Sequence, residues 1–278
     1  MTRRSLLQAS GAVALANQLA AADAPAEGRL KQSVSRWTYK NYSVDELCQH
    51  AVKIGLKGID LVDSTDWPTI QKYGLTPSMT PGAGTIPHGF NRREHHDQLV
   101  QEMEANITKA AAAKVPNVIT FSGNREGLPD AEGIENCVVG LNRCKRFAEE
   151  KGVTINMELL NSKVNHKDYQ CDHTAWGVEV MKRVGSPRVK LLYDIYHMQI
   201  MEGDIVRTIR DNIAYLGHFH TGGVPGRHEI DQTQELNWRF VAQAIADLNF
   251  QGFIAHEFVP IAKDPIASLR QAYETCKV

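Results

Sequence analysis

The feature that most constrains the fold is a regular alternation of short β-branched runs with longer amphipathic stretches, from about residue 33 to the C-terminus. This alternation predicts parallel strands joined by crossover helices. The predicted strands are residues 34–39, 58–62, 75–80, 117–122, 154–160, 190–196, 215–221 and 252–259. The predicted helices are residues 43–54, 65–73, 92–113, 130–151, 174–184, 204–211, 234–248 and 265–275.

Eight strands that alternate with eight helices, with no Pro/Gly/Ser-rich linker between them, predict an α/β protein with a single (β/α)8 barrel. A doubly wound open sheet is the alternative. It is disfavoured because no G-x-G-x-x-G follows the first predicted strand. We expect one catalytic barrel domain over residues 33–278, preceded by a linker over 23–32.

Residues 1–22 are predicted to be a targeting segment rather than part of the fold. Arg3 and Arg4 precede a weakly apolar run, which ends in the small residues Ala20 to Ala22 before Asp23. This order resembles a bacterial twin-arginine export signal and predicts export to the periplasm. The structural alternative is an Ala-rich tail. No other stretch is long and apolar enough to span a membrane, so no membrane span is expected after cleavage.

Charge and cysteine content limit the partners and the chemistry. The net charge is −1, and removal of Arg3 and Arg4 with the signal would change it to −3, so there is no basic excess for binding nucleic acid. The five cysteines form no C-x-x-C motif, and we expect mainly buried thiols. A small-molecule substrate is therefore expected, while the oligomeric state stays open, a homo-oligomer included.

Polar side chains interrupt four consecutive predicted strands close to their carboxyl ends. They are Glu158, Asp194, His220 and Glu257, with His197 just beyond Asp194. A buried carboxylate without a partner costs several kcal/mol, and three acids cannot neutralise one another. A divalent cation can neutralise the three carboxylates, so the pattern predicts a metal site at the catalytic end of the barrel. Taken singly, Asp194 could cap a helix, His220 could be a core histidine, and each glutamate could pair with a buried base.

Three segments carry a family resemblance that extends over nearly the whole chain after residue 33. They are N-M-E-L-L-N-S-K at 156–163, Y-D-I-Y-H-M-Q at 193–199 and V-P-G-R-H-E at 224–229. Together they resemble the hydroxypyruvate isomerase family, which belongs with the ketose 3-epimerases to the xylose isomerase-like barrels. The resemblance implies a (β/α)8 barrel, a divalent metal ion and an aldose–ketose isomerisation by proton transfer.

The resemblance also implies roles for residues of this chain. It places the metal ion on Glu158, Asp194, His220 and Glu257, acid–base catalysis on Glu158 and Glu257, and substrate contacts on His197 and Arg227. Three carboxylates and one imidazole favour Mg²⁺ or Mn²⁺, with Co²⁺ as a further candidate. The expected reaction converts hydroxypyruvate into 2-hydroxy-3-oxopropanoate (tartronate semialdehyde) through an enediolate, which the cation stabilises while the two glutamates act as acid and base.

Other functions and other roles stay open from the sequence. Ketose 3-epimerisation would use the same four residues, an endonuclease IV-like phosphodiesterase would use the same barrel, and an exported sugar-binding protein would need no catalysis. Arg227 could hold a substrate carboxylate or pair with Glu229 or Asp231 on its own loop. His197 could contact substrate or orient Asp194. The loop at 81–93 is long enough to act as a lid, and Trp37 and Trp67 are candidates for the pocket wall or the core.

Overall fold

A computed structural model of the protein describes residues 28–278. The predicted export signal and most of the predicted linker lie outside the described residues. The first strand, β1, begins at Lys31, within the predicted linker over 23–32. The strands are β1 Lys31–Ser35, β2 Gly58–Asp60, β3 Thr76–Pro77, β4 Thr80–Ala83, β5 Asn117–Thr120, β6 Thr154–Leu159, β7 Val189–Asp194, β8 Leu216–Thr221 and β9 Phe253–His256.

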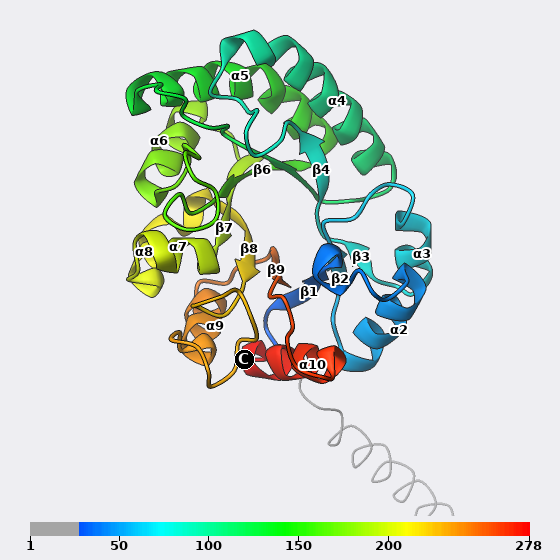
Figure 1. The fold of residues 1–278 in the computed structure, drawn as a ribbon. Helices are drawn as coiled ribbons and strands as arrows, with labels where there is room; N and C mark the ends of the chain where they lie inside the picture. Colours follow the sequence, from blue (N-terminus) through cyan, green and yellow to red (C-terminus); the bar gives the residue numbers. More distant parts are fainter. Residues whose placement is uncertain (1–27) are drawn as a thin grey trace, which may run out of the picture.

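The helices alternate with the strands and surround them (Figure 1). The α-helices are α2 Val44–Ile54, α3 Trp67–Lys72, α4 His96–Ala112, α5 Asp130–Lys151, α6 Thr174–Val184, α7 Ile195–Met201, α8 Ile205–Asn212, α9 Trp238–Asp247 and α10 Pro265–Cys276. Short 3₁₀ helices are η1 Arg36–Tyr39, η2 Arg93–His95 and η3 Ile213–Tyr215. None of the helices between residues 28 and 278 has the length and apolar character needed to cross a membrane.

All strand pairs are parallel, and the sheet order is β3-β2-β1-β9-β8-β7-β6-β5-β4. The two ends of this order, β3 and β4, are consecutive pieces of the third predicted strand. β3 pairs with β2 and β4 pairs with β5, so this interrupted strand closes the barrel. Pro77 lies in β3 and Pro81 in β4, and neither has a backbone N–H to donate to the ladder. The predicted (β/α)8 barrel is therefore confirmed.

Several observed strands end earlier than predicted, and local hydrogen bonds explain two of these differences. The first strand ends at Ser35 instead of residue 39, because the Thr38 hydroxyl donates to the Ser35 carbonyl and stabilises the 3₁₀ turn that follows. The sixth predicted strand ends at Asp194 instead of residue 196. There the Asp194 carboxylate accepts the backbone N–H of His197 and caps α7, a helix that was not predicted.

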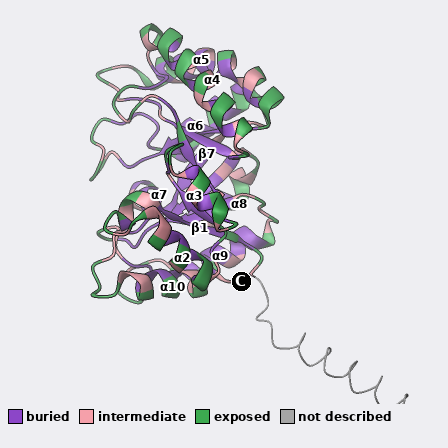
Figure 2. Cartoon of the chain, turned by 90° about the vertical axis from the view of Figure 1, so that its right-hand side faces the viewer, coloured by how far each residue is buried: buried purple, intermediate pink, exposed green. Residues whose placement is uncertain are grey.

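The main hydrophobic core lies between the strands and the surrounding helices, and the helices expose their outer faces (Figure 2). Amphipathic helices place their apolar residues against the sheet, as Leu99, Met103 and Ile107 of α4 do. Ser43 and Glu46 form a capping box at the start of α2. All five cysteines are buried and free, which confirms that expectation. This rigid frame holds the strand ends together at one face of the barrel.

Candidate active site

Four side chains predicted to bind metal meet at the carboxyl ends of the strands. Glu158 lies on β6, Asp194 ends β7, His220 lies on β8 and Glu257 directly follows β9. One potential ligand atom from each lies within 4.8 Å of the others, and all four residues are buried. The four predicted metal ligands therefore lie together in the structure, and they come from neighbouring strands of one sheet.

The donor atoms of this cluster are arranged around the imidazole of His220. Its Nδ1 is 2.7 Å from Glu257 Oε2, 3.4 Å from Glu158 Oε1 and 3.9 Å from Asp194 Oδ2. This nitrogen is buried and makes no hydrogen bond of acceptable geometry within the described part of the chain. A buried, unpartnered nitrogen that faces three carboxylates suits a divalent cation with mixed oxygen and nitrogen ligands.

The two glutamates have different electrostatic environments. Burial and the negative charges of Glu257 and Asp194 raise the pKa of Glu158 to about 7. Burial acts in the same direction on Glu257, but the positive charges of Arg227 and His220 hold its pKa well below the ordinary value. Burial raises the pKa of Asp194 to about 6 against the charge of Arg227. Two carboxyl groups whose pKa values are pushed apart are typical of acid–base pairs.

Arg227 reaches into this acidic cluster from the loop after β8. Its Nη2 donates to Asp194 Oδ2 at 2.9 Å and forms a close ion pair with Glu257, while Nε donates to the Glu257 carbonyl. The guanidinium lies over the rings of Trp37 and Tyr196, at 5.7 and 5.1 Å from their centroids. The alternative of a pair with Glu229 or Asp231 on its own loop is not what the structure shows.

His197 and Arg227 face each other with two donors. The backbone N–H of Asn161 donates to His197 Nδ1, so in the neutral ring the proton lies on Nε2. Burial and the charge of Arg227 lower the pKa of His197 well below its usual value, which favours the neutral ring. Its Nε2 is 2.7 Å from Arg227 Nη1, which also carries protons. His197 thus lies in direct contact with both Asn161 and the guanidinium of Arg227.

Asp60 is a site residue that the sequence interpretation missed. It ends β2, is fully buried, and its Oδ2 is 2.9 Å from Nε2 of His220. Its other oxygen accepts from Ser78 and is 3.1 Å from His218 Nε2. A carboxylate on one imidazole nitrogen leaves the other nitrogen available as a ligand. An acid inside a predicted barrel strand, the signal that identified Glu158, would also have found Asp60.

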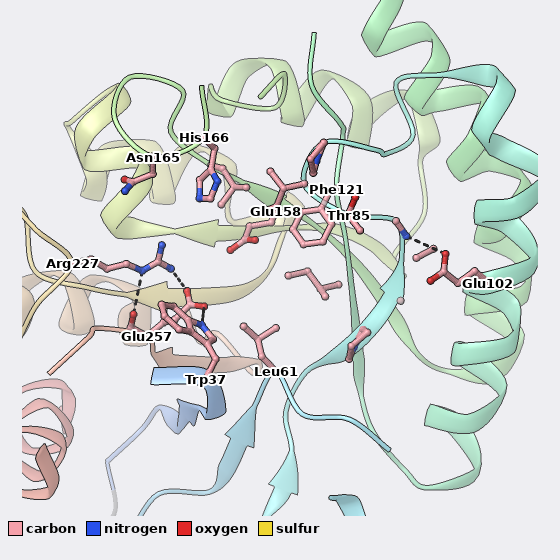
Figure 3. A pocket seen from close by; sticks show the side chains of 18 residues that line it. Trp37, Leu61, Thr85, Glu102, Phe121, Glu158, Asn165, His166, Arg227 and Glu257 are labelled. Atoms are coloured by element: carbon pink, nitrogen blue, oxygen red, sulfur yellow. Dashed lines mark hydrogen bonds and ion pairs between the residues drawn. The ribbon is translucent and has the colours of Figure 1, made fainter. Parts of the chain in front are cut away.

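A cavity of about 780 Å³ opens above the cluster (Figure 3). Its lining residues are Trp37, Leu61, Pro81, Gly82, Ala83, Gly84, Thr85, Ile86, Pro87, Glu102, Ile119, Phe121, Glu158, Leu160, Asn165, His166, Arg227 and Glu257. Trp37 forms part of this wall and donates from Nε1 to Glu257 Oε1 at 2.6 Å, whereas Trp67 is buried in the core. The first half of the predicted lid, residues 81–87, lines the opposite side.

Glu229, in the same loop as Arg227, has a structural role. Its Oε1 accepts from the backbone N–H groups of Ile261 and Ala262 and from the Ser268 hydroxyl, at 3.0, 3.0 and 3.1 Å. Burial opposes ionisation of Glu229, but these donors hold its pKa below the ordinary value. The carboxylate thereby attaches the Arg227 loop to the segment between β9 and α10.

We expect Glu229→Ala to lower the free energy of unfolding by about 1–3 kcal/mol at pH 7, because buried donors lose their acceptor. A depressed native pKa contributes stability above the unfolded pKa, and this contribution is lost as the pH falls through the native pKa. The difference between the variant and the parent should therefore shrink in acid. Urea unfolding at pH 7 and at decreasing pH measures both effects. Equal stability at pH 7 would contradict this role.

The fold and the cluster define a class: a closed parallel barrel with an acidic centre at the carboxyl ends of its strands. Residues 67–275 match the family model described as xylose isomerase-like TIM barrel. The chain therefore belongs to this family.

Comparisons with individual proteins agree with this assignment. A putative hydroxypyruvate isomerase of Danio rerio is 31% identical over 138 residues, which cover 46% of this chain and 50% of that protein. A D-psicose 3-epimerase of Agrobacterium fabrum is 34% identical over 131 residues, covering 46% and 41% of the two chains. The chain thus spans about half the length of the curated relatives it matches. A crystal structure of an AP endonuclease, family 2, from Brucella melitensis has a TM-score of 0.76 at 22% identity, covering 86% of this chain and 97% of that one, and it shows the shared fold.

Proposed function

We propose that the protein is a divalent-metal-dependent isomerase that transfers a proton between neighbouring carbons of a hydroxy carbonyl compound. The observation that carries this proposal is the buried cluster of Glu158, Asp194, His220 and Glu257, which opens into the cavity. The names of the relatives, an isomerase and an epimerase, support the same class of chemistry.

Removal of a proton from carbon next to a carbonyl creates an enediolate, whose negative charge must be stabilised as it forms. A bound divalent cation would supply this stabilisation as a Lewis acid. Glu158 and Glu257 both line the cavity, so one carboxylate can take the proton and the other carboxyl group can return one to the neighbouring carbon. Asp194 and His220 would complete the ligand set.

Asp60 would act through His220, since its carboxylate accepts from Nε2 and leaves Nδ1 as the ligand atom. We expect Asp60→Asn to weaken metal binding about 10–100-fold, as loss of such a partner typically does. Titration of the metal-free protein with Mn²⁺ measures this affinity directly. Asp172→Asn is the matched control, since Asp172 is also a buried aspartate but its carboxylate pairs with Arg125 and lies outside the cluster. Unchanged Mn²⁺ affinity in Asp60→Asn would remove Asp60 from the site.

Hydroxypyruvate, with tartronate semialdehyde as product, is the first substrate to test. The motif at 224–229 supports it, and so does the name of the Danio rerio relative. Ketose 3-epimerisation is the second candidate, and two observations favour it. Arg227 already pairs with Asp194 and Glu257, and the cavity is far larger than a three-carbon acid requires.

Product analysis on the metal-loaded protein tests the proposal. We expect turnover of hydroxypyruvate, of a free ketohexose, or of both, and a loss of this turnover in Glu158→Gln. Absence of turnover on a panel of 2-oxo acids and ketoses, with metal content confirmed, would contradict the proposal.

Arg227→Lys distinguishes the two substrate classes. Lysine keeps the charge but loses the fork geometry that holds a carboxylate through two bonds. If Arg227 binds the substrate carboxylate, the substitution should lower kcat/KM about ten- to a hundredfold more for hydroxypyruvate than for a ketose. This is the loss expected when a charge-assisted hydrogen bond is removed. Equal losses on both substrates would assign Arg227 to the organisation of Asp194 and Glu257 and would favour epimerisation.

A further inference from the structure

The cavity extends well beyond the groups that perform the proposed chemistry. Arg227 and Glu257 lie at one end and Glu102 at the other, with Leu61 and Phe121 between them (Figure 3). A volume of about 780 Å³ falls in the range of pockets that enclose drug-sized molecules. A substrate that occupied only the part of the cavity at Glu158 and Glu257 would leave the rest of the cavity filled with water.

The side of the cavity away from Arg227 is built from apolar side chains. These are Leu61, Pro81, Ala83, Ile86, Pro87, Ile119 and Phe121, and we call them the apolar subsite. Leu61 and Phe121 are half-buried and pack on a small cluster of Met79, Ile119 and Leu192, which is separate from the main core. The subsite therefore rests on this small cluster and, through Ala83, Ile86 and Phe121, on the main core.

Leu61 is held in an unusual backbone conformation at the end of β2. Its φ is +51°, in the left-handed region that a leucine rarely adopts. Backbone strain of this kind is concentrated at functional sites. Leu61 directly follows Asp60, so the segment that positions His220 also presents an apolar side chain to the cavity.

The charges around the cavity argue against an anionic group in the subsite. Among the described lining residues, Arg227 is the one arginine or lysine, and it is paired with Asp194 and Glu257. The ionisable side chain on the far side is an acid, Glu102, whose carboxylate accepts the backbone N–H of Gly84. A phosphate or carboxylate there would meet a negative charge and no basic partner.

We infer that the substrate is a hydroxy ketone that carries an uncharged, apolar group of about aromatic-ring size on the side away from its reacting carbons. This inference rests on the proposed function and specifies its substrate class. The hydroxy ketone would lie at Glu158 and Glu257, and the apolar group would contact Leu61 and Phe121. A sugar derivative with an aryl or alkyl substituent has this chemistry.

Hydroxamates test the inference by binding alone, because their adjacent oxygens chelate a divalent cation as the oxygens of an enediolate would. We would measure the Kd of acetohydroxamate, benzohydroxamate and phosphonoacetohydroxamate for the Mn²⁺-loaded protein by calorimetry. Benzohydroxamate should bind about ten- to a hundredfold more tightly than acetohydroxamate, because burial of a phenyl ring is favourable. Phosphonoacetohydroxamate should gain no affinity over acetohydroxamate.

Leu61→Asn provides the matched variant, since asparagine tolerates a positive φ but removes the apolar contact. It should reduce the preference for benzohydroxamate at least severalfold and leave the Kd of acetohydroxamate unchanged. Phe240→Asn is the control, because Phe240 is an exposed aromatic residue of α9 that does not line the cavity, and it should preserve the preference.

The outcomes separate the inference from the function on which it rests. Equal affinity for acetohydroxamate and benzohydroxamate, or tighter binding of the phosphonate, would overturn the inference while the metal site stands. Failure of every hydroxamate to bind the Mn²⁺-loaded protein would instead count against the proposed function.

Discussion

Replacement of Glu257 by glutamine should reduce kcat by a factor of about 10²–10⁴ or more and leave the barrel folded. The amide retains the size of the side chain and an oxygen that can accept from Trp37, but it cannot take up or return a proton at the reacting carbon. It also lacks the negative charge that faces His220 and Arg227, so the metal site weakens as well.

The kcat of Glu257→Gln should be measured with saturating Mn²⁺, with circular dichroism to confirm the fold. Glu235→Gln is a matched control, because Glu235 is exposed and pairs only with Gln199 among the recorded side-chain contacts of its carboxylate. We expect parental activity in the control. Parental turnover in Glu257→Gln would exclude this residue from the proton transfer.

Removal of the metal ion should abolish turnover, and Mn²⁺ or Mg²⁺ should restore it. Without a cation, no group near the substrate can stabilise the enediolate to the same extent. The metal-free protein should remain folded, because Arg227 pairs with Asp194 and Glu257 and Asp60 pairs with His220. Turnover and elemental analysis after chelation and after readdition of metal check this expectation. Full activity in protein shown to be metal-free would refute the Lewis-acid role.

The fold was largely predictable because a barrel of this kind requires strand and helix patterns that alternate regularly along the sequence. The helices α5 and α6 have the predicted bounds, since their apolar spacing is long and regular. Two of the errors in the strand boundaries fall where a side chain hydrogen-bonds to the local backbone. Thr38 turns the chain out of β1, and Asp194 starts α7 where a longer strand was expected. Such bonds depend on single residues and leave no periodic pattern.

Much of the candidate site could also be predicted, because carboxyl ends of neighbouring parallel strands must converge. Glu158, Asp194, His220 and Glu257 meet for this reason. The contacts of Arg227 could not be predicted, since they depend on the course of a loop that crosses to Asp194. Asp60 lies inside a predicted strand, as Glu158 does, so the same signal could have identified it, whereas its contact with His220, 160 residues away, leaves no local spacing to detect. The resemblance supplied the roles, and they stay predictions until activity is measured.

The central claim is that this site transfers a proton at carbon next to a carbonyl. The most direct test is incubation of the Mn²⁺-loaded protein with hydroxypyruvate or a ketohexose in D₂O, followed by NMR at early times. We predict a product that carries solvent deuterium at the carbon that receives the proton, and no such product with Glu158→Gln or Glu257→Gln. Product formation without deuterium, or deuterium incorporation that survives both substitutions, would contradict proton transfer by these two glutamates.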